Sequence, residues 1–194
     1  MRSRSFQNGA GHKAAFSIRP AIRADFSEII EVDKSASLLF GPTGLLSEEA
    51  LADHVPAQAL QDALNQDWLL VAEMPDKAVV GFVMATVRDG GLYVDQLSVS
   101  PDYGRQGIGT ALMRNLEGKA HNRDILELTL STFRDLPWNA PFYATLGFRH
   151  IKRSHLRPFM LEIETAQAEF MDVSKRTFMR KRLRKTLFRS KKAQ

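Results

Sequence analysis

Residues 92–117, LYVDQLSVSPDYGRQGIGTALMRNLE, constrain the fold more than any other part of the chain. They predict a strand, a short connection, a glycine-rich turn and an amphipathic helix, in that order. Gly104, Gly107 and Gly109 carry no Cβ atom, so the backbone of the turn can curl and approach a ligand closely. The arrangement places free backbone N–H groups at the start of a helix, where they can hold an anionic phosphate group.

The spacing of the glycines separates this turn from two other phosphate-binding loops. The nucleotide-triphosphate loop requires a lysine where Thr110 stands in this chain. The dinucleotide fingerprint G-x-G-x-x-G begins at Gly107 but ends wrongly, on Leu112. The remaining pattern is G-x-x-G-x-G, with Arg105 and Gln106 inside it. By itself this pattern is equally compatible with a plain surface turn before a helix.

Two flanking sequences favour a binding loop. DQLSVSP precedes the turn at residues 95–101, and WNAPFYATLGF follows at residues 138–148. With the turn, they resemble the GNAT superfamily of N-acyltransferases, which bind acetyl-coenzyme A or a related acyl-CoA. The family pattern is L-x-V-x-P, then [QR]-x-x-G-x-[GA] and a helix, then N-x-x-x-x-Y-x-x-x-G-F or a close variant. The first turn position is Gly104 here, and the basic residue follows at Arg105.

The resemblance covers residues 16–183, and the run FRDLPWN is similar to that of an uncharacterised bacterial subgroup. It implies an α/β fold with a mixed, mostly antiparallel sheet of about six to seven strands flanked by helices. It also implies a bulge at Leu97-Ser98-Val99 that splays this strand from the next one. We expect one domain at residues 16–184, between a flexible tail at 1–15 and a basic tail at 185–194.

The resemblance further implies where the cofactor binds. The N–H groups of residues 105–110 would hold the pyrophosphate, aided by the helix dipole. The splayed strand would pair with the pantetheine arm, and the Val99 N–H would point at the thioester oxygen. The expected cofactor-binding residues are Leu97, Ser98, Val99, Arg105, Gln106, Gly107, Ile108, Gly109, Thr110 and Asn139.

The expected catalytic residues are Tyr143, Asp95 and, as an alternative base, Glu31. Tyr143 shares a helix face with Asn139 and would protonate the leaving thiolate, although it could also be an ordinary half-buried aromatic residue with Asn139 as a helix cap. Asp95 would remove the proton of the amine. It is two residues before Leu97, so we expect both side chains on one face of the strand, with that of Gln96 on the other.

Other candidates for the general base lie at the end of the first helix. Glu31 and Asp33 are carboxylates at positions where substrate loops form in this family. Each of them could equally be a solvated helix carboxylate. Trp138 could wall the acceptor pocket or simply pack against its neighbours. No covalent enzyme intermediate is needed, because bringing the amine and the thioester together supplies much of the acceleration.

Composition excludes several other kinds of site. The chain has no cysteine, its five histidines show no paired metal spacing, and no G-x-S-x-G elbow is present. No apolar run approaches the ~20 residues that span a bilayer. We therefore expect a cytoplasmic protein with no metal and no membrane partner. The first fifteen residues resemble a transit peptide in charge but lack an amphipathic apolar face, so we interpret them as a flexible tail.

The net charge of +5 conceals an uneven distribution. Residues 175–192 hold ten of the 27 basic residues and no acid, so the rest of the chain is acidic. We interpret this basic end as an exposed last strand with a solvated tail, in part packed on the core through Phe178 and Leu183. A nucleic-acid-binding patch is the alternative, but no aromatic stacking platform is interleaved with the charges.

Three functions thus remain in order of preference. The first is an acyl-CoA-dependent N-acyltransferase that passes acetyl to a primary amine by direct attack in a ternary complex. The second is a non-catalytic acyl-CoA-binding regulatory module, and the third is a nucleic-acid-binding protein acting through the basic end. A small-molecule or peptide amine is the expected acceptor. The acyl chain length and a homodimeric state are left open.

Overall fold

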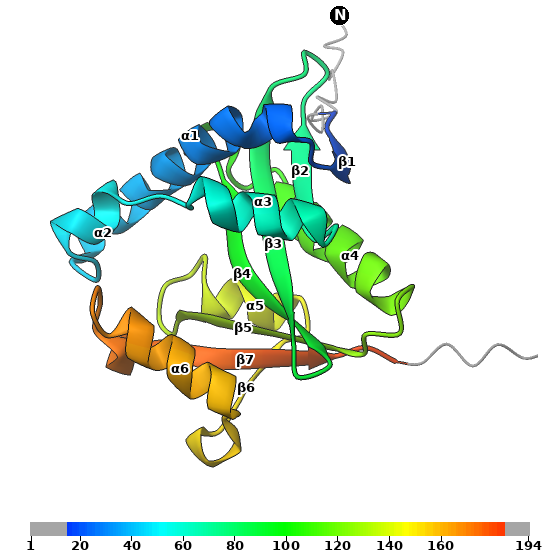
Figure 1. The fold of residues 1–194 in the computed structure, drawn as a ribbon. Coiled ribbons are helices and arrows are strands. Elements are labelled where there is room, and N and C mark those ends of the chain that lie inside the picture. Colours follow the sequence, from blue (N-terminus) through cyan, green and yellow to red (C-terminus); the bar gives the residue numbers. More distant parts are fainter. Residues whose placement is uncertain (1–14, 185–194) are drawn as a thin grey trace, which may run out of the picture.

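In the computed structural model, residues 15–184 are described, and they form one seven-stranded sheet in the order β1-β2-β3-β4-β5-β7-β6 (Figure 1). The strands are β1 (Ser17–Pro20), β2 (Leu69–Glu73), β3 (Val79–Arg88), β4 (Gly91–Val99), β5 (Glu127–Phe133), β6 (Arg149–His150) and β7 (Arg176–Arg182). Among these described strands only β4 and β5 pair in parallel. The predicted mixed, mostly antiparallel sheet is confirmed. The two predicted tails, apart from Ala15, lie outside the described residues.

Local sequence signals set the ends of several helices. The helices are α1 (Phe26–Ser37), α2 (Glu48–Ala52), α3 (Ala57–Asn65), α4 (Ile108–His121), α5 (Ala140–Thr145) and α6 (Pro158–Gln167). Ser47 caps α2 by accepting a 3.1 Å hydrogen bond from the Ala50 N–H. Pro56 precedes α3, and Gly147 follows α5 with a left-handed φ of +91°. None of the described helices is both long enough and apolar enough to cross a membrane.

Apolar side chains cover both faces of the sheet. On one face, Leu112 and Leu116 of α4 pack against Val83 of β3. On the other face, Phe82 of β3 packs with Leu60 of α3 and with side chains of α1. Successive residues of β3 therefore serve opposite faces, as a strand buried on both sides requires. Figure 1 shows α1 and α3 on one side of the upper sheet and α4 on the other.

The strands β4 and β5 separate halfway along β4. Their pairing is confined to residues 92–94 of β4 and 128–130 of β5, whereas β4 stays paired with β3 up to Val99. Met84 is opposite Gln96 and Ala85 is opposite Val94, so Asp95 is an extra residue in β4. The predicted splay is confirmed, but the prediction of the bulge at residues 97–99 is wrong. The bulge lies at Asp95, where the strand loses its partner on one side.

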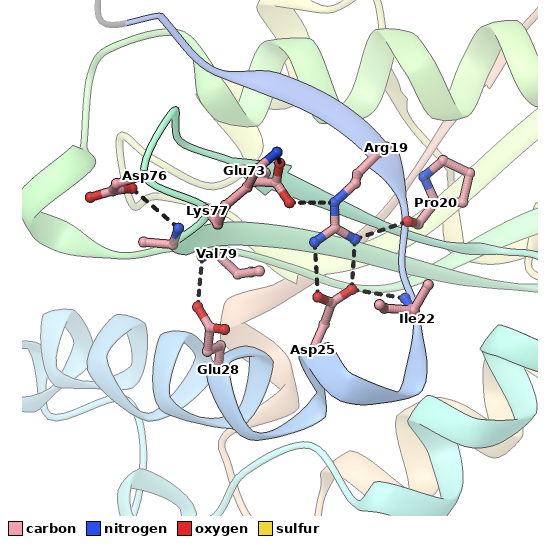
Figure 2. A network of polar contacts seen from close by, with 10 residues as sticks. Arg19, Pro20, Ile22, Asp25, Glu28, Glu73, Asp76, Lys77 and Val79 are labelled. Atoms are coloured by element: carbon pink, nitrogen blue, oxygen red, sulfur yellow. Dashed lines mark hydrogen bonds and ion pairs between the residues drawn. The ribbon is translucent and has the colours of Figure 1, made fainter.

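A polar network joins β1 to α1 and β2 (Figure 2). The Arg19 guanidinium donates hydrogen bonds to both oxygens of Asp25, at 2.7 and 2.9 Å, and to Glu73 Oε2 at 2.7 Å. Nearby, Glu28 of α1 accepts a 2.8 Å hydrogen bond from the N–H of Val79 at the start of β3. These contacts hold the N-terminal end of α1 against the sheet.

Candidate functional site

A cavity of about 1250 Å³ opens where β4 leaves β5. Its walls are the second half of β4, the turn before α4, the end of β5, the start of α5, the end of α1 and parts of the chain after α2 and α6. The splay creates this space, because beyond Val94 no strand of the described structure pairs with the edge of β4 that faces β5. The cavity is large enough for a sizeable ligand.

The glycine turn borders this cavity with unused hydrogen-bond donors. Gly104 N–H donates to Pro101 O at 3.0 Å, and Ala111 N–H donates to Gly107 O at 2.9 Å. Between them, none of the backbone N–H groups of residues 105–110 donates a hydrogen bond within the described part of the chain. Gly107 has a φ of +86°, which glycine adopts without strain. The turn is therefore suited to hold an anion.

Most of the expected cofactor-binding residues are brought together here. Leu97, Ser98, Val99, Arg105, Gly107, Ile108, Gly109, Thr110 and Asn139 line the cavity, and of the expected residues only Gln106 does not. The Gln106 Oε1 atom is instead buried with no hydrogen-bond partner among the described residues. The close packing of the turn extends to α5, because a Cβ atom on Gly109 would lie 3.5 Å from the Phe142 ring.

The bulge changes the direction of Asp95. Its Oδ2 accepts a 2.7 Å hydrogen bond from the Thr86 hydroxyl, on the same face of β3 as Met84. Leu97 packs on the opposite face, with the α4 cluster. The prediction that Asp95 and Leu97 share a face is therefore wrong. The prediction that Gln96 lies on the face opposite to Asp95 is also wrong. Both fail because the extra residue resets the alternation of side chains after Val94.

Burial raises the pKa of Asp95 to about 6, although the hydrogen bond from Thr86 and the charge of Arg88 oppose this rise. The carboxyl group also lines the cavity. A carboxylate with a pKa near neutrality can accept a proton from a substrate and release it again at physiological pH. The structure thus leaves Asp95 suited to proton transfer.

The other two candidate bases differ sharply in placement. Glu31 is exposed, pairs with Lys34 at 2.9 Å and does not line this cavity. Asp33 is buried at the cavity wall, where its Oδ1 accepts 2.8 Å hydrogen bonds from Gln96 Nε2 and from the Ser98 hydroxyl. Its Oδ2 accepts a hydrogen bond from the N–H of residue 55 at 2.9 Å. Asp33 therefore joins β4 to the segment after α2.

The start of α5 brings Asn139 and Tyr143 to the cavity. Asn139 donates through Nδ2 to Thr132 Oγ1 at 2.8 Å, makes no side-chain capping bond, and keeps a buried Oδ1 with no partner among the described residues. Tyr143 packs its ring against Phe142 and Phe148. Burial raises the pKa of Tyr143 above its ordinary value, and the charge of Arg176 opposes part of this rise. Its phenol stays protonated at neutral pH.

Sequence reasoning missed Arg176, which lines the same cavity from β7. Its Nε donates to Ser131 Oγ at 3.1 Å, its Nη2 donates to Ser131 O at 2.9 Å, and its guanidinium lies 4.8 Å from the Phe133 ring centre. The residue was counted with the basic end of the chain. The available signal was its position two residues before Phe178, which is buried on the same strand.

Aromatic side chains form one edge of the cavity. Trp138 is 44% exposed, and its ring meets that of Phe40 edge-on at 6.2 Å. Phe40 in turn lies 5.6 Å from Phe133. All three residues line the cavity, so Trp138 both packs and forms a wall.

Comparisons with known proteins agree with this geometry. Residues 33–158 match a family model described as an acetyltransferase (GNAT) domain. The structure of the PaiA N-acetyltransferase from Thermoplasma acidophilum, in complex with coenzyme A, is 19% identical with a TM-score of 0.65, over 87% of this chain and 99% of that chain.

Two further solved structures are similar. N-acetylglutamate synthase from Neisseria gonorrhoeae, complexed with coenzyme A and N-acetyl-glutamate, is 18% identical with a TM-score of 0.63, over 88% of this chain and 36% of that chain. The ribosomal-protein-S18-alanine N-acetyltransferase from Escherichia coli is 15% identical with a TM-score of 0.62, over 87% of this chain and 94% of that chain. At these identities the likeness is one of fold.

Proposed function

This chain belongs to the GNAT acetyltransferase family, and from that premise we propose that it transfers an acetyl group from acetyl-CoA to a primary amine. The reaction would proceed by direct attack in a ternary complex. One observation carries the proposal: the cavity between β4 and β5 is bordered both by unused backbone N–H groups and by a buried phenol. The N–H groups suit the anionic phosphates of an acetyl carrier, and the phenol suits a departing thiolate.

The residues of the glycine turn fit coenzyme A. The N–H groups of residues 105–110 can bind the pyrophosphate, and the positive end of the α4 dipole adds to the attraction. The free edge of β4 beyond Val94 can pair with the pantetheine arm as an added strand would. Asn139 Oδ1, buried and without a partner in the described structure, can accept a hydrogen bond from the same arm. When bound, acetyl-CoA supplies the activated acetyl group as a thioester.

Asp95 and Tyr143 have separate proton-transfer roles in this proposal. Asp95 lies on the sheet face of α1 and α3, whereas Tyr143 belongs to the cluster on the α4 face. The amine would therefore approach from the side of Asp95, and the thiolate would depart toward the side of Tyr143. Asp95 takes the proton from the attacking nitrogen as the carbon–nitrogen bond forms. Tyr143 would hold the proton that the departing sulfur takes up, and solvent would return the proton from Asp95 to the phenolate.

The experiment that tests the function is an amine panel incubated with acetyl-CoA, with release of free thiol followed over time. Calorimetry measures acetyl-CoA binding in parallel. Binding together with amine-dependent thiol release is the expected result. Binding without release on any amine favours the non-catalytic module instead. Absence of binding to a folded protein contradicts the role of the glycine turn.

A further inference from the structure

Arg176 is a cation in the cavity wall without a carboxylate partner. No Asp or Glu among residues 15–184 forms an ion pair with it. The acidic groups that influence it are the phenols of Tyr93 and Tyr143. Burial raises the pKa of both phenols above the ordinary value, so both are neutral at pH 7. The guanidinium therefore has no compensating negative charge in the described structure.

The guanidinium is nevertheless held in a fixed orientation. The Ser131 hydroxyl accepts from Arg176 Nε at 3.1 Å and donates to Gln167 Oε1 of α6 at 3.1 Å. The Ser131 carbonyl accepts from Nη2 at 2.9 Å, and the Phe133 ring packs on the plane of the group. Within residues 15–184, neither the edge formed by Nη1 and the second Nη2 hydrogen nor the side-chain NH₂ of Gln167 makes a hydrogen bond. Such an edge matches a carboxylate, which accepts two parallel N–H bonds.

Removing a cation from water without a partner is costly, so a fixed and uncompensated guanidinium at a cavity wall indicates an anionic ligand. In the proposed function, the pyrophosphate of coenzyme A would occupy the α4 turn. Arg176 lies on the opposite face of the sheet, beside Ser131 and α6. This is also the face of Asp95, from which the amine approaches. The ligand of Arg176 is thus a part of the acceptor.

We propose that Arg176 binds a carboxylate of the acceptor, so that the substrate is a small amine that also carries a carboxylate group. This inference rests on the proposed acetyl transfer and specifies its acceptor. The aromatic edge formed by Phe40, Phe133 and Trp138 lies beside this position and can contact an apolar part of the same molecule. The acceptor class is that of amino acids and similar amino carboxylates.

The test compares three forms of each acceptor: an L-amino acid, its carboxamide, and the matching amine without the carboxyl group. Thiol release at saturating acetyl-CoA gives kcat/KM for each form. The acid is expected to exceed the carboxamide by at least about thirtyfold, as for the loss of one partner of a buried charge pair. The amine of the carboxamide is less basic than that of the acid, so more of it is unprotonated and reactive at neutral pH. This difference favours the carboxamide and so opposes the expected preference for the acid. A preference therefore reports the carboxylate.

Arg176→Gln is expected to reduce the preference for the acid over the carboxamide to within about threefold, with acetyl-CoA affinity nearly unchanged; the ratio is the readout, because the lost charge also acts on Tyr143 whichever acceptor is used. Arg176→Lys should restore part of the preference, because it returns the charge without the paired donors. Arg134→Gln is the matched control: Arg134 is exposed, lies beside the same strand end, and does not line the cavity. It should keep the full preference. Thermal melts verify that each variant is folded.

Binding measurements separate this inference from turnover. NMR line broadening of the same acids and carboxamides, in the presence of coenzyme A, reports carboxylate-dependent binding whether or not transfer occurs. Preferential binding of acids that disappears in Arg176→Gln supports the inference. Equal binding of acids and carboxamides, or a preference that survives in Arg176→Gln, overturns it. Turnover of neutral amines without any acid preference also overturns it, while leaving the acetyl transfer intact.

Discussion

The Thr86 hydroxyl donates a 2.7 Å hydrogen bond to Asp95 Oδ2, joining β3 to the extra residue of β4. The bond stabilises the charged form of a carboxyl group whose pKa burial raises to about 6. Asp95 is thus held in a fixed direction while keeping a pKa close to physiological pH. The proton transfer that we propose for Asp95 would therefore depend on Thr86, a residue that does not line the cavity.

The pH profile of thiol release should show a transition at the pKa of Asp95. Asp95 accepts a proton only as the carboxylate, so kcat should fall as the pH decreases through about 6. Asp95→Asn should lower kcat by about 10²–10⁴ and abolish this acidic limb. Thr86→Val removes the hydrogen bond that lowers the pKa, so the limb should move to higher pH. An identical limb in Asp95→Asn would assign the base to another group.

Gly107→Val should weaken acetyl-CoA binding at least about tenfold, or about 1.4 kcal/mol, by calorimetry. The added side chain would occupy the space in which, in the proposed function, the pyrophosphate approaches the turn. Valine at a φ of +86° also strains the backbone, so Gly90→Val is the control. Gly90 has a φ of +74° in the β3–β4 turn, away from the cavity. It should lose stability to a similar extent and bind normally. Equal acetyl-CoA affinity in the two variants would show that the glycine turn is not part of the cofactor site.

Asp33→Ala should lower the free energy of unfolding by about 2–4 kcal/mol in denaturant titrations. The change leaves three donors without their acceptor, those of Gln96, Ser98 and the residue 55 N–H. Asp135 is exposed and makes no side-chain hydrogen bond in the described structure, so Asp135→Ala should stay within about 0.5 kcal/mol of the parent. Similar small losses in both variants would contradict the structural role of Asp33.

Arg19→Met should reduce stability by about 1–3 kcal/mol at pH 7 and alter its acid dependence. Burial alone would raise the pKa of Asp25, but the hydrogen bonds from Arg19 and the Ile22 N–H lower it below its usual range. Its stabilisation is therefore present above the unfolded pKa of about 3.9 and is lost as the pH falls through the lower folded pKa. The free energy of unfolding of the parent should decrease below about pH 4. Its dependence on pH in this range should be weaker in Arg19→Met.

Lys77→Met is the control for this change. Lys77 also pairs with Glu73, but its side chain is 80% exposed, so the pair contributes little. The variant should keep both the stability and the acid slope of the parent. Equal acid slopes in the parent and in Arg19→Met would contradict the role assigned to the Arg19–Asp25 pair.

Much of this fold could be predicted because the residues that begin and end its helices act locally. Ser47, Pro56 and Gly147 act through the conformation or capping bonds of their own neighbourhood, so their positions reveal helix ends. The family pattern likewise identified the turn and the short helix, and the resemblance is confirmed. The end of α2 at Ala52, by contrast, is followed by a contact with a distant segment. The N–H of residue 55 donates to Asp33 instead of continuing a helix.

The errors in the site have a common physical origin. Alternation continues unbroken through β4 in the sequence, and only pairing with β3 reveals that Asp95 is the extra residue. Arg176 stands in a run of basic residues, and its recess beside Ser131 exists only once β5 and β7 are paired. Both features follow from contacts between segments far apart in the chain, which the sequence pattern does not contain.

Tyr143→Phe keeps the ring, with its packing against Phe142 and Phe148, and removes only the hydroxyl. The phenol carries its proton at neutral pH, so the proton is available to the departing thiolate. Turnover should fall by about 10²–10⁴ with acetyl-CoA affinity unchanged, placing the role in the transition state. Tyr93→Phe is the control, because Tyr93 is buried against Phe159 and does not line the cavity. Its turnover should stay near that of the parent. If Tyr143→Phe turns over within about threefold of the parent while chemistry limits the rate, the thiolate departs without a general acid.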